Sequence, residues 1–165
     1  MKFVLNSRSA LGLIFSGLAV TTGITVTTFF KDNSVAYAQE IRIAQARTPL
    51  AKKLQGKPVV VEIHADWCPA CRSISPMMKS LQKDYGNKAN FVKFDITNKS
   101  TIQAAEAKAR QLGLGGFFAN YKTRNATVVI IDPATGQIVK QFTKNTNKNN
   151  YVVALNQAIS QISKK

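Results

Sequence analysis

A strand that runs directly into a Cys-x-x-Cys pair constrains the fold of this chain more than any other feature. We predict the strand over residues 57–65, where valine dominates and Glu62 is the only acid. Such a continuous apolar run is typical of a strand buried on both faces. Cys68 and Cys71 follow, and apolar residues then recur with helical spacing over residues 70–85. The sequence therefore predicts a strand, a turn and a helix, with Cys68 at the start of the helix.

The position of the cysteine pair predicts redox chemistry. At a helix N-terminus the unpaired N–H groups and the helix dipole favour an anion, and the thiolate is the reactive form of cysteine. A disulfide between positions three apart closes a small ring, which stabilises the fold by only about 2 kcal/mol. We therefore expect a bond that cycles, with Cys68 as the exposed nucleophile and Cys71 as the more buried resolving thiol.

Other uses of the same two thiols stay open. The pair could form a structural disulfide, but a closed zinc site needs four ligands and the chain has two cysteines and one histidine, His64. Soft thiolates also suit Cu(I), so a Cu(I)-handling binding module that uses Cys68 and Cys71 is the alternative to disulfide exchange. For the redox interpretation we expect no cofactor and no resident metal.

The residues around the pair resemble the thioredoxin superfamily. The shared features are the buried strand, the acid six residues before Cys68, Trp67 directly before it and Pro76 five residues after Cys71. The sequence Ala-Asp-Trp-Cys at residues 65–68 is similar to that of the extracytoplasmic members. The resemblance covers roughly residues 48–163 and is densest around Cys68. It implies a thioredoxin-like α/β fold, with helices on both faces of a mixed central sheet, and a protein-disulfide oxidoreductase.

The resemblance also implies roles for the residues around the cysteines. Glu62 stands where the superfamily keeps a buried acid, which would make it a proton shuttle for Cys71, although a glutamate could also extend to the surface. Trp67 would shield the site and contact substrate, together with Pro69 and Ala70 between the cysteines. His64 shares the strand face of Glu62 and would either tune the pair or line the rim of the site.

One loop departs from the pattern of the superfamily. A cis-proline normally precedes the strand that faces the cysteines, and the loop around it offers backbone hydrogen bonds to substrate. Here Ala126 stands at that position, between Asn125 and Thr127. Because a cis bond without proline costs about 3 kcal/mol, we expect a trans peptide at Ala126. By resemblance all three residues are candidate substrate-binding positions.

The N-terminal segment has the pattern of a signal for export. Residues 1–38 combine Lys2 and Arg8, an uncharged stretch over residues 10–30 and an Ala-Tyr-Ala sequence that ends at Ala38. We predict a signal peptide over 1–38, a lead-in over 39–47 and one thioredoxin-like domain over 48–165. An uncleaved membrane anchor through residues 10–30 is the alternative. In both cases the domain would lie outside the cytoplasm, in a periplasm or an equivalent lumen, where disulfides persist.

The charge of the chain bears on its partners. The formal net charge is +15, and cleavage after Ala38 would remove three basic residues and one acid and leave +13. Because the lysines are spread along the chain and the chain is predicted to be exported, we exclude nucleic acid as a partner. We expect protein thiols and disulfides as partners, and a membrane electron donor or an oxidase to set the redox state.

The remainder of the chain supplies the other elements of the predicted fold. We predict a short helix over 48–55, a strand over 91–96, a helix over 100–112 that ends at Gly113, a hairpin with strands over 127–131 and 137–143, and a final helix over 150–162. Residues 144–150 are predicted to be a polar linker. Phe117 and Phe118 follow a glycine cluster and would form either core or an apolar lip at the site.

Overall fold

The computed structural model describes residues 48–164, so the predicted signal peptide and lead-in lie outside the described residues. The elements in chain order are η1 (Lys52–Leu54), β1 (Val59–His64), α2 (Pro69–Tyr85), β2 (Asn90–Asp95), α3 (Lys99–Gln111), α4 (Gly115–Tyr121), β3 (Thr127–Ile131), β4 (Ile138–Thr143) and α5 (Lys148–Ile162). Among these described residues, no helix has the length and apolar character that crossing a membrane requires.

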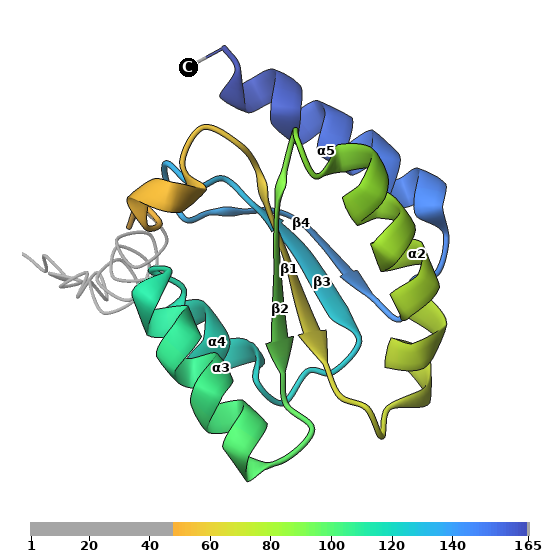
Figure 1. The fold of residues 1–165 in the computed structure, drawn as a ribbon. Helices are drawn as coiled ribbons and strands as arrows, with labels where there is room; N and C mark the ends of the chain where they lie inside the picture. Colours follow the sequence, from red (N-terminus) through yellow and green to blue (C-terminus); the bar gives the residue numbers. More distant parts are fainter. Residues whose placement is uncertain (1–47, 165) are drawn as a thin grey trace, which may run out of the picture. The chain divides into compact units, whose positions relative to one another are not determined.

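The four strands form one mixed sheet in the order β2-β1-β3-β4 (Figure 1). β1 is parallel to β2, whereas β3 is antiparallel to both β1 and β4. Every residue of β1 and β3 is buried, because each strand has a neighbour on both sides and helices cover both faces. β4 forms an edge and is mostly exposed. The strand that leads to the cysteines is therefore held inside the sheet.

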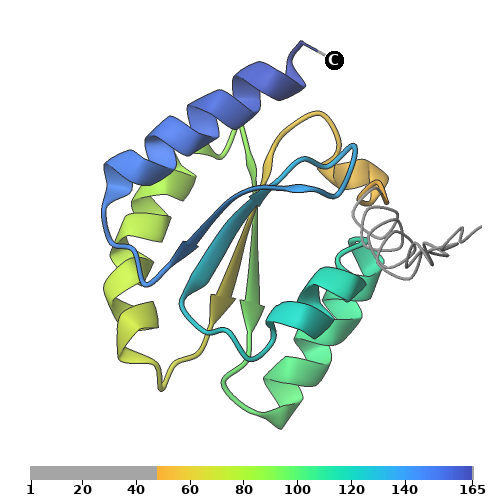
Figure 2. The same ribbon diagram turned by 180° about the vertical axis from the view of Figure 1, so that it is seen from behind.

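Helices α2 and α5 cover one face of the sheet, and α3 and α4 cover the other (Figures 1 and 2). Beneath α4, the rings of Phe94 and Phe118 meet edge to face with centroids 5.1 Å apart. Beneath α5, the rings of Phe142 and Tyr151 lie 4.2 Å apart. Such pairs bury large apolar areas and anchor the helices. The predicted α/β thioredoxin-like fold, a mixed sheet with helices on both faces, is confirmed.

The helix predicted over residues 48–55 is wrong, because only the three residues of η1 are helical. The backbone in this region bonds to distant segments instead of to itself. The N–H of Leu50 donates to the oxygen of Pro133 at 2.8 Å, and the N–H of Ala51 donates to the oxygen of Leu112 at 3.0 Å. These bonds hold the segment against distant parts of the chain, and Ala51 has a ψ of 145°, so helical backbone begins only at Lys52.

Helix α4 is an element that the sequence did not predict. It contains adjacent glycines, which lower intrinsic helix propensity. Its stability comes from packing, since Phe118 is fully buried in the core. Phe117 is half-buried and stacks on Tyr121 with ring centroids 4.4 Å apart. Of the two roles considered for Phe117 and Phe118, Phe118 has the first, because it is part of the core.

The ends of α3 and α5 show how caps set helix limits. Gly113 follows α3 with a φ of 74°, which confirms the predicted stop at a residue that tolerates a left-handed backbone. The polar linker predicted over 144–150 is too long, because α5 begins at Lys148. The side chain of Asn147 accepts a hydrogen bond from the N–H of Asn149 at 3.0 Å and caps the helix there.

Candidate active site

Cys68 lies where the chain passes from β1 into α2. The turn after β1 is closed by a hydrogen bond from the N–H of Cys68 to the oxygen of Ala65 at 3.1 Å. Pro69 takes the first helical position, where no N–H partner is needed. Cys68 itself caps the helix, and its Sγ accepts a hydrogen bond from the N–H of Cys71 at 3.2 Å. The predicted placement of Cys68 at the start of the helix is confirmed.

Both cysteines are free thiols and both are buried. The exposed fraction is 3% for Cys68 and 1% for Cys71. The expectation of an exposed nucleophile is therefore wrong for the dithiol form. The physical reason is that the start of α2 packs against β1, where the Sγ of Cys71 lies 4.0 Å from the oxygen of Ile63.

The acidity of the two thiols is shifted in opposite directions. Burial alone would raise the pKa of Cys68, but hydrogen bonds from the Cys71 side chain and from two helix N–H groups outweigh it. The charge of Lys144 acts in the same direction, so the pKa of the Cys68 thiol is lowered below its usual value. Burial and the hydrogen bond with Cys68 raise the pKa of the Cys71 thiol to about 11. The arrangement makes Cys68 the more acidic of the two thiols and keeps Cys71 protonated at neutral pH.

Behind the cysteines, three side chains form a chain of contacts. Glu62 is buried, as the resemblance implied, and does not extend to the surface. Its Oε1 lies 3.3 Å from Nδ1 of His64, and Nε2 of His64 lies 3.1 Å from Oδ1 of Asp66. His64 is also buried. The carboxylate of Asp66, by contrast, is largely exposed.

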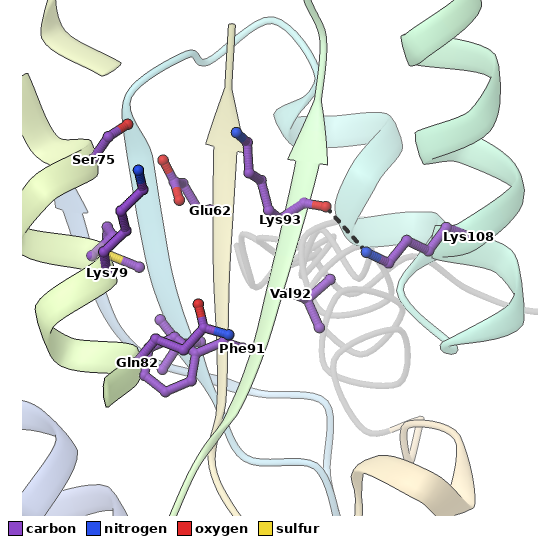
Figure 3. Close-up of a pocket in the computed structure, with 10 residues that line it drawn as sticks. Glu62, Ser75, Lys79, Gln82, Phe91, Val92, Lys93 and Lys108 are labelled. Atoms are coloured by element: carbon purple, nitrogen blue, oxygen red, sulfur yellow. Dashed lines mark hydrogen bonds between the residues drawn. The ribbon is translucent and has the colours of Figure 1, made fainter. Parts of the chain in front are cut away.

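A cavity of about 330 Å³ opens beside Glu62, between α2 and the strands β1 and β2. Lys79 from α2 and Lys93 from β2 line the same cavity, together with Ser75 and Gln82 (Figure 3). Lys93 is the direct partner of Glu62 in the parallel pairing of β1 and β2. The buried carboxylate therefore faces two cationic side chains.

The residues predicted to contact substrate differ in exposure. The indole of Trp67 is 57% exposed, and its Nε1 donates a hydrogen bond to the oxygen of Thr97 at 3.0 Å. Pro69 is exposed, and Ala70 and Asn125 are half-buried. In contrast, Ala126 and Thr127 are buried.

Ala126 has an unusual but well-supported backbone. No cis peptide bond is found among the described residues, which confirms the trans peptide expected at this position. Its φ is 55°, in the left-handed region that a residue with a Cβ rarely adopts. The N–H of Ala126 donates to the oxygen of Ile63 at 3.0 Å, and its oxygen accepts from the N–H of Lys144 at 2.8 Å. Both bonds fix the turn against its neighbouring strands.

Two residues near the site could not be identified from the sequence. Lys144 lies in the predicted linker, yet its charge acts on Cys68. Thr97 follows β2, and its Oγ1 accepts a hydrogen bond from the N–H of Asp66 at 3.0 Å. Both are remote from the cysteines along the chain, and neither belongs to a local pattern that would signal the contact. Among the described residues, no group of three or more potential metal ligands is found.

Comparisons with known proteins point to one family. A model of the thioredoxin family, described as Thioredoxin, matches residues 40–111. The thiol:disulfide interchange protein TxlA homolog of Synechocystis sp. is 41% identical over 60 residues, which are 36% of this chain and 33% of that protein. The chloroplastic thioredoxin-like protein HCF164 of Arabidopsis thaliana is 30% identical over 83 residues, 49% of this chain and 32% of that protein. The chain thus spans about a third of the length of these relatives.

Among solved structures, the X-ray structure of Fasciola hepatica thioredoxin is similar to the chain. Its sequence is 24% identical, the match covers 74% of this chain and 93% of that protein, and the TM-score is 0.46.

Proposed function

Because the chain carries a thioredoxin-family domain, we propose that it is a thiol-disulfide oxidoreductase that exchanges disulfides with protein partners through Cys68 and Cys71. The observation that carries the proposal is the position of Cys68 at the N-cap of α2, where its Sγ accepts from the N–H of Cys71 and the two thiol pKa values shift in opposite directions. A lowered pKa provides an attacking thiolate, and a raised pKa keeps the second thiol protonated until it is needed.

The exchange takes place in two steps. The Cys68 thiolate attacks one sulfur of the partner disulfide, the partner S–S bond breaks, and the other partner sulfur leaves as a thiolate. The Cys71 thiol then loses its proton and attacks Sγ of Cys68, which releases the second partner thiolate. The partner gains two electrons as two thiols, and the domain is left with a Cys68–Cys71 disulfide. The reverse sequence oxidises a partner.

The second step needs a proton acceptor, because the pKa of Cys71 is raised to about 11. Glu62 is the proposed acceptor, since it is a buried acid on the strand that faces the cysteine helix. Substrate contact is proposed for the exposed Trp67 and for Pro69, Ala70 and Asn125 around it. Ala126 and Thr127 are buried and would support this surface from behind.

The compartment and the redox partners are also part of the proposal. The export pattern of residues 1–38 supports a domain that works outside the cytoplasm, and an uncleaved segment 10–30 would attach it to the membrane. There a membrane electron donor or an oxidase would return the cysteine pair to its starting state. A titration of the pair against glutathione buffers would give its potential and the direction of electron flow.

The two steps can be separated with a dithiobis(nitrobenzoate) probe, which releases one coloured thiolate at each step. We expect the full reduced chain to release two equivalents, and Cys71→Ser to release one and keep the adduct. Cys68→Ser should lose the fast first release. The two proteins differ only in which sulfur remains, so each is the control of the other. Equal first-release rates for Cys68→Ser and wild type would contradict the proposal, and insulin disulfides then test a protein partner.

A further inference from the structure

The contacts among Glu62, His64 and Asp66 connect a buried group to solvent. Residues 62 and 64 share one face of β1, and residue 66 follows in the turn. The exposed fraction of the side chain is 10% at Glu62, 6% at His64 and 73% at Asp66. Each nitrogen of the imidazole contacts one of the two carboxylates, at 3.3 Å and 3.1 Å.

The number of protons that the three side chains share decides which of these contacts can be hydrogen bonds. A neutral imidazole carries one N–H, so it can donate to only one of the two carboxylates. Both contacts are hydrogen bonds only when the three groups together hold one further proton, on the second nitrogen or on a carboxyl oxygen. A proton that arrives at Nδ1 can then be matched by one that leaves from Nε2. This is the property required of a proton relay.

Charged groups on neighbouring elements face the same three residues. On β2, Lys93 is paired with Glu62 and Asp95 with His64, and Asp95 also accepts hydrogen bonds from Thr97. On α2, Lys79 lines the cavity beside Glu62. The Sγ of Cys71 lies 4.0 Å from the backbone oxygen of Ile63, the residue that follows Glu62 on β1.

Two further groups reach this chain of contacts from the helices. The guanidinium of Arg72 donates to the backbone oxygen of Asp66 at 2.9 Å, not to its carboxylate. On α5, the Tyr151 hydroxyl interacts electrostatically with Glu62 but donates its hydrogen bond to Asn145. The exposed carboxylate of Asp66 is thus left facing His64 and water.

We propose that Glu62, His64 and Asp66 form a proton relay that carries the proton of Cys71 to solvent during the second step. The proposal rests on the proposed function. The Cys71 proton passes to Glu62, Glu62 protonates Nδ1 of His64, Nε2 of His64 gives its proton to Asp66, and Asp66 releases it to water. When the disulfide is reduced again, the same hops run in reverse, so the imidazole returns to its starting tautomer.

The cavity beside Glu62 offers water a competing route, and the test must distinguish the two. In the probe reaction, the readout is the ratio of the second release rate to the first. His64→Gln keeps a polar side chain whose NH2 group can donate a hydrogen bond to one carboxylate, but it cannot pass a proton. We expect it to lower the ratio about tenfold below pH 8 and less at higher pH, where hydroxide serves as acceptor. An unchanged ratio at every pH would mean that the proton leaves through the cavity.

Asp66→Asn is the second variant, because an exposed side chain is replaced without risk to folding. We expect a fall of about threefold in the ratio, and no change for the matched control Asp84→Asn on α2. Glu62→Gln combined with His64→Gln should be no slower than the slower single variant, since both interrupt one path. Additive losses, or equal effects of Asp66→Asn and Asp84→Asn, would overturn the relay.

The failure of the relay and of the proposed function give different results. A wild-type chain without a fast first release contradicts disulfide exchange itself. A normal first release with an unaffected second release in His64→Gln removes the relay alone. Because His64 is the only histidine of the chain, its ring nitrogens give one pair of NMR signals. Asp66→Asn should shift the Nε2 signal more than the Nδ1 signal, and Glu62→Gln the reverse; the opposite pattern would contradict the contacts.

Discussion

The start of α2 and the turn before β3 lie against the same cysteine pair but are stabilised in different ways. At the start of α2, backbone N–H groups of Ala70 and Cys71 donate to the sulfur of Cys68. At the turn before β3, Ala126 takes a left-handed backbone, and both its polar groups are bonded to neighbouring strands. One region therefore directs its donors at the sulfur of Cys68, whereas the other uses its backbone bonds to hold the turn in place.

This difference shows how two thiols three residues apart acquire opposite acidities. Cys68 receives hydrogen bonds from helix N–H groups, which favour its charged form. The Cys71 thiol faces the interior, where burial is the largest influence and favours its neutral form. Cys68 therefore attacks first because it lies at the helix N–H groups, and Cys71 reacts second because it lies in the interior.

The largest expected effect is on the turn before β3. Ala126→Pro would require a φ near −65° where the backbone has 55°, and would remove the N–H that donates to Ile63. We expect a loss of about 3 kcal/mol or more in the free energy of unfolding, measured by urea denaturation. Ala126→Gly is the matched control and should stay within about 1 kcal/mol of wild type. A stable proline variant would show that the turn is not fixed as described.

The second prediction concerns the buried thiol. The pKa of Cys71 is raised from 9.0 to about 11 on folding, so the unfolded chain loses this proton first as the pH rises. The stabilisation is present below pH 9 and is lost between pH 9 and about 11, by up to about 3 kcal/mol. Denaturation of the reduced chain across this range should show a larger loss in wild type than in Cys71→Ser, because the raised pKa of Tyr151 lowers the stability of both proteins at the upper end of the range. Parallel curves for the two proteins would contradict it.

A smaller effect is expected at Cys68 when its strongest donor is removed. Cys71→Ala deletes the side-chain hydrogen bond that is the largest influence lowering the Cys68 pKa. We expect the midpoint of the pH profile for alkylation of Cys68 to move upward. Cys71→Ser retains a hydroxyl donor and should move it less. Identical midpoints in the alanine and serine variants would assign the low pKa to the helix N–H groups alone.

The smallest expected effect is that of Lys144, which acts on Cys68 through charge and without a hydrogen bond. Lys144→Gln should move the same alkylation midpoint slightly upward at low salt. The difference should vanish near 1 M salt, where the Debye length is only about 3 Å. Lys140→Gln on the exposed strand β4 is the control and should have no effect. A shift that persists at high salt would point to altered backbone at Lys144 instead of charge.

The start of α2 was predictable because its signals are local. The apolar run of β1, the proline at the first helical position and the position of Cys68 are adjacent in the sequence, and each matches the structure. The N-terminal residues 48–55 and helix α4 were missed, since bonds to Pro133 and Leu112 and the burial of Phe118 override local preference there. The left-handed turn at Ala126 likewise has no signal in its own residues.

The sequence by itself determined the fold class, the cysteine pair and the presence of an acid in the central strand, because these depend on residue type and short spacing. Only the tertiary structure decided that Cys68 is buried and that Lys144 acts on it. It also decided that His64 joins Glu62 to Asp66, because parity places residues 62 and 64 on one face but cannot give the distances between side chains. The physical reason is that burial and charge interactions depend on segments that only folding brings together.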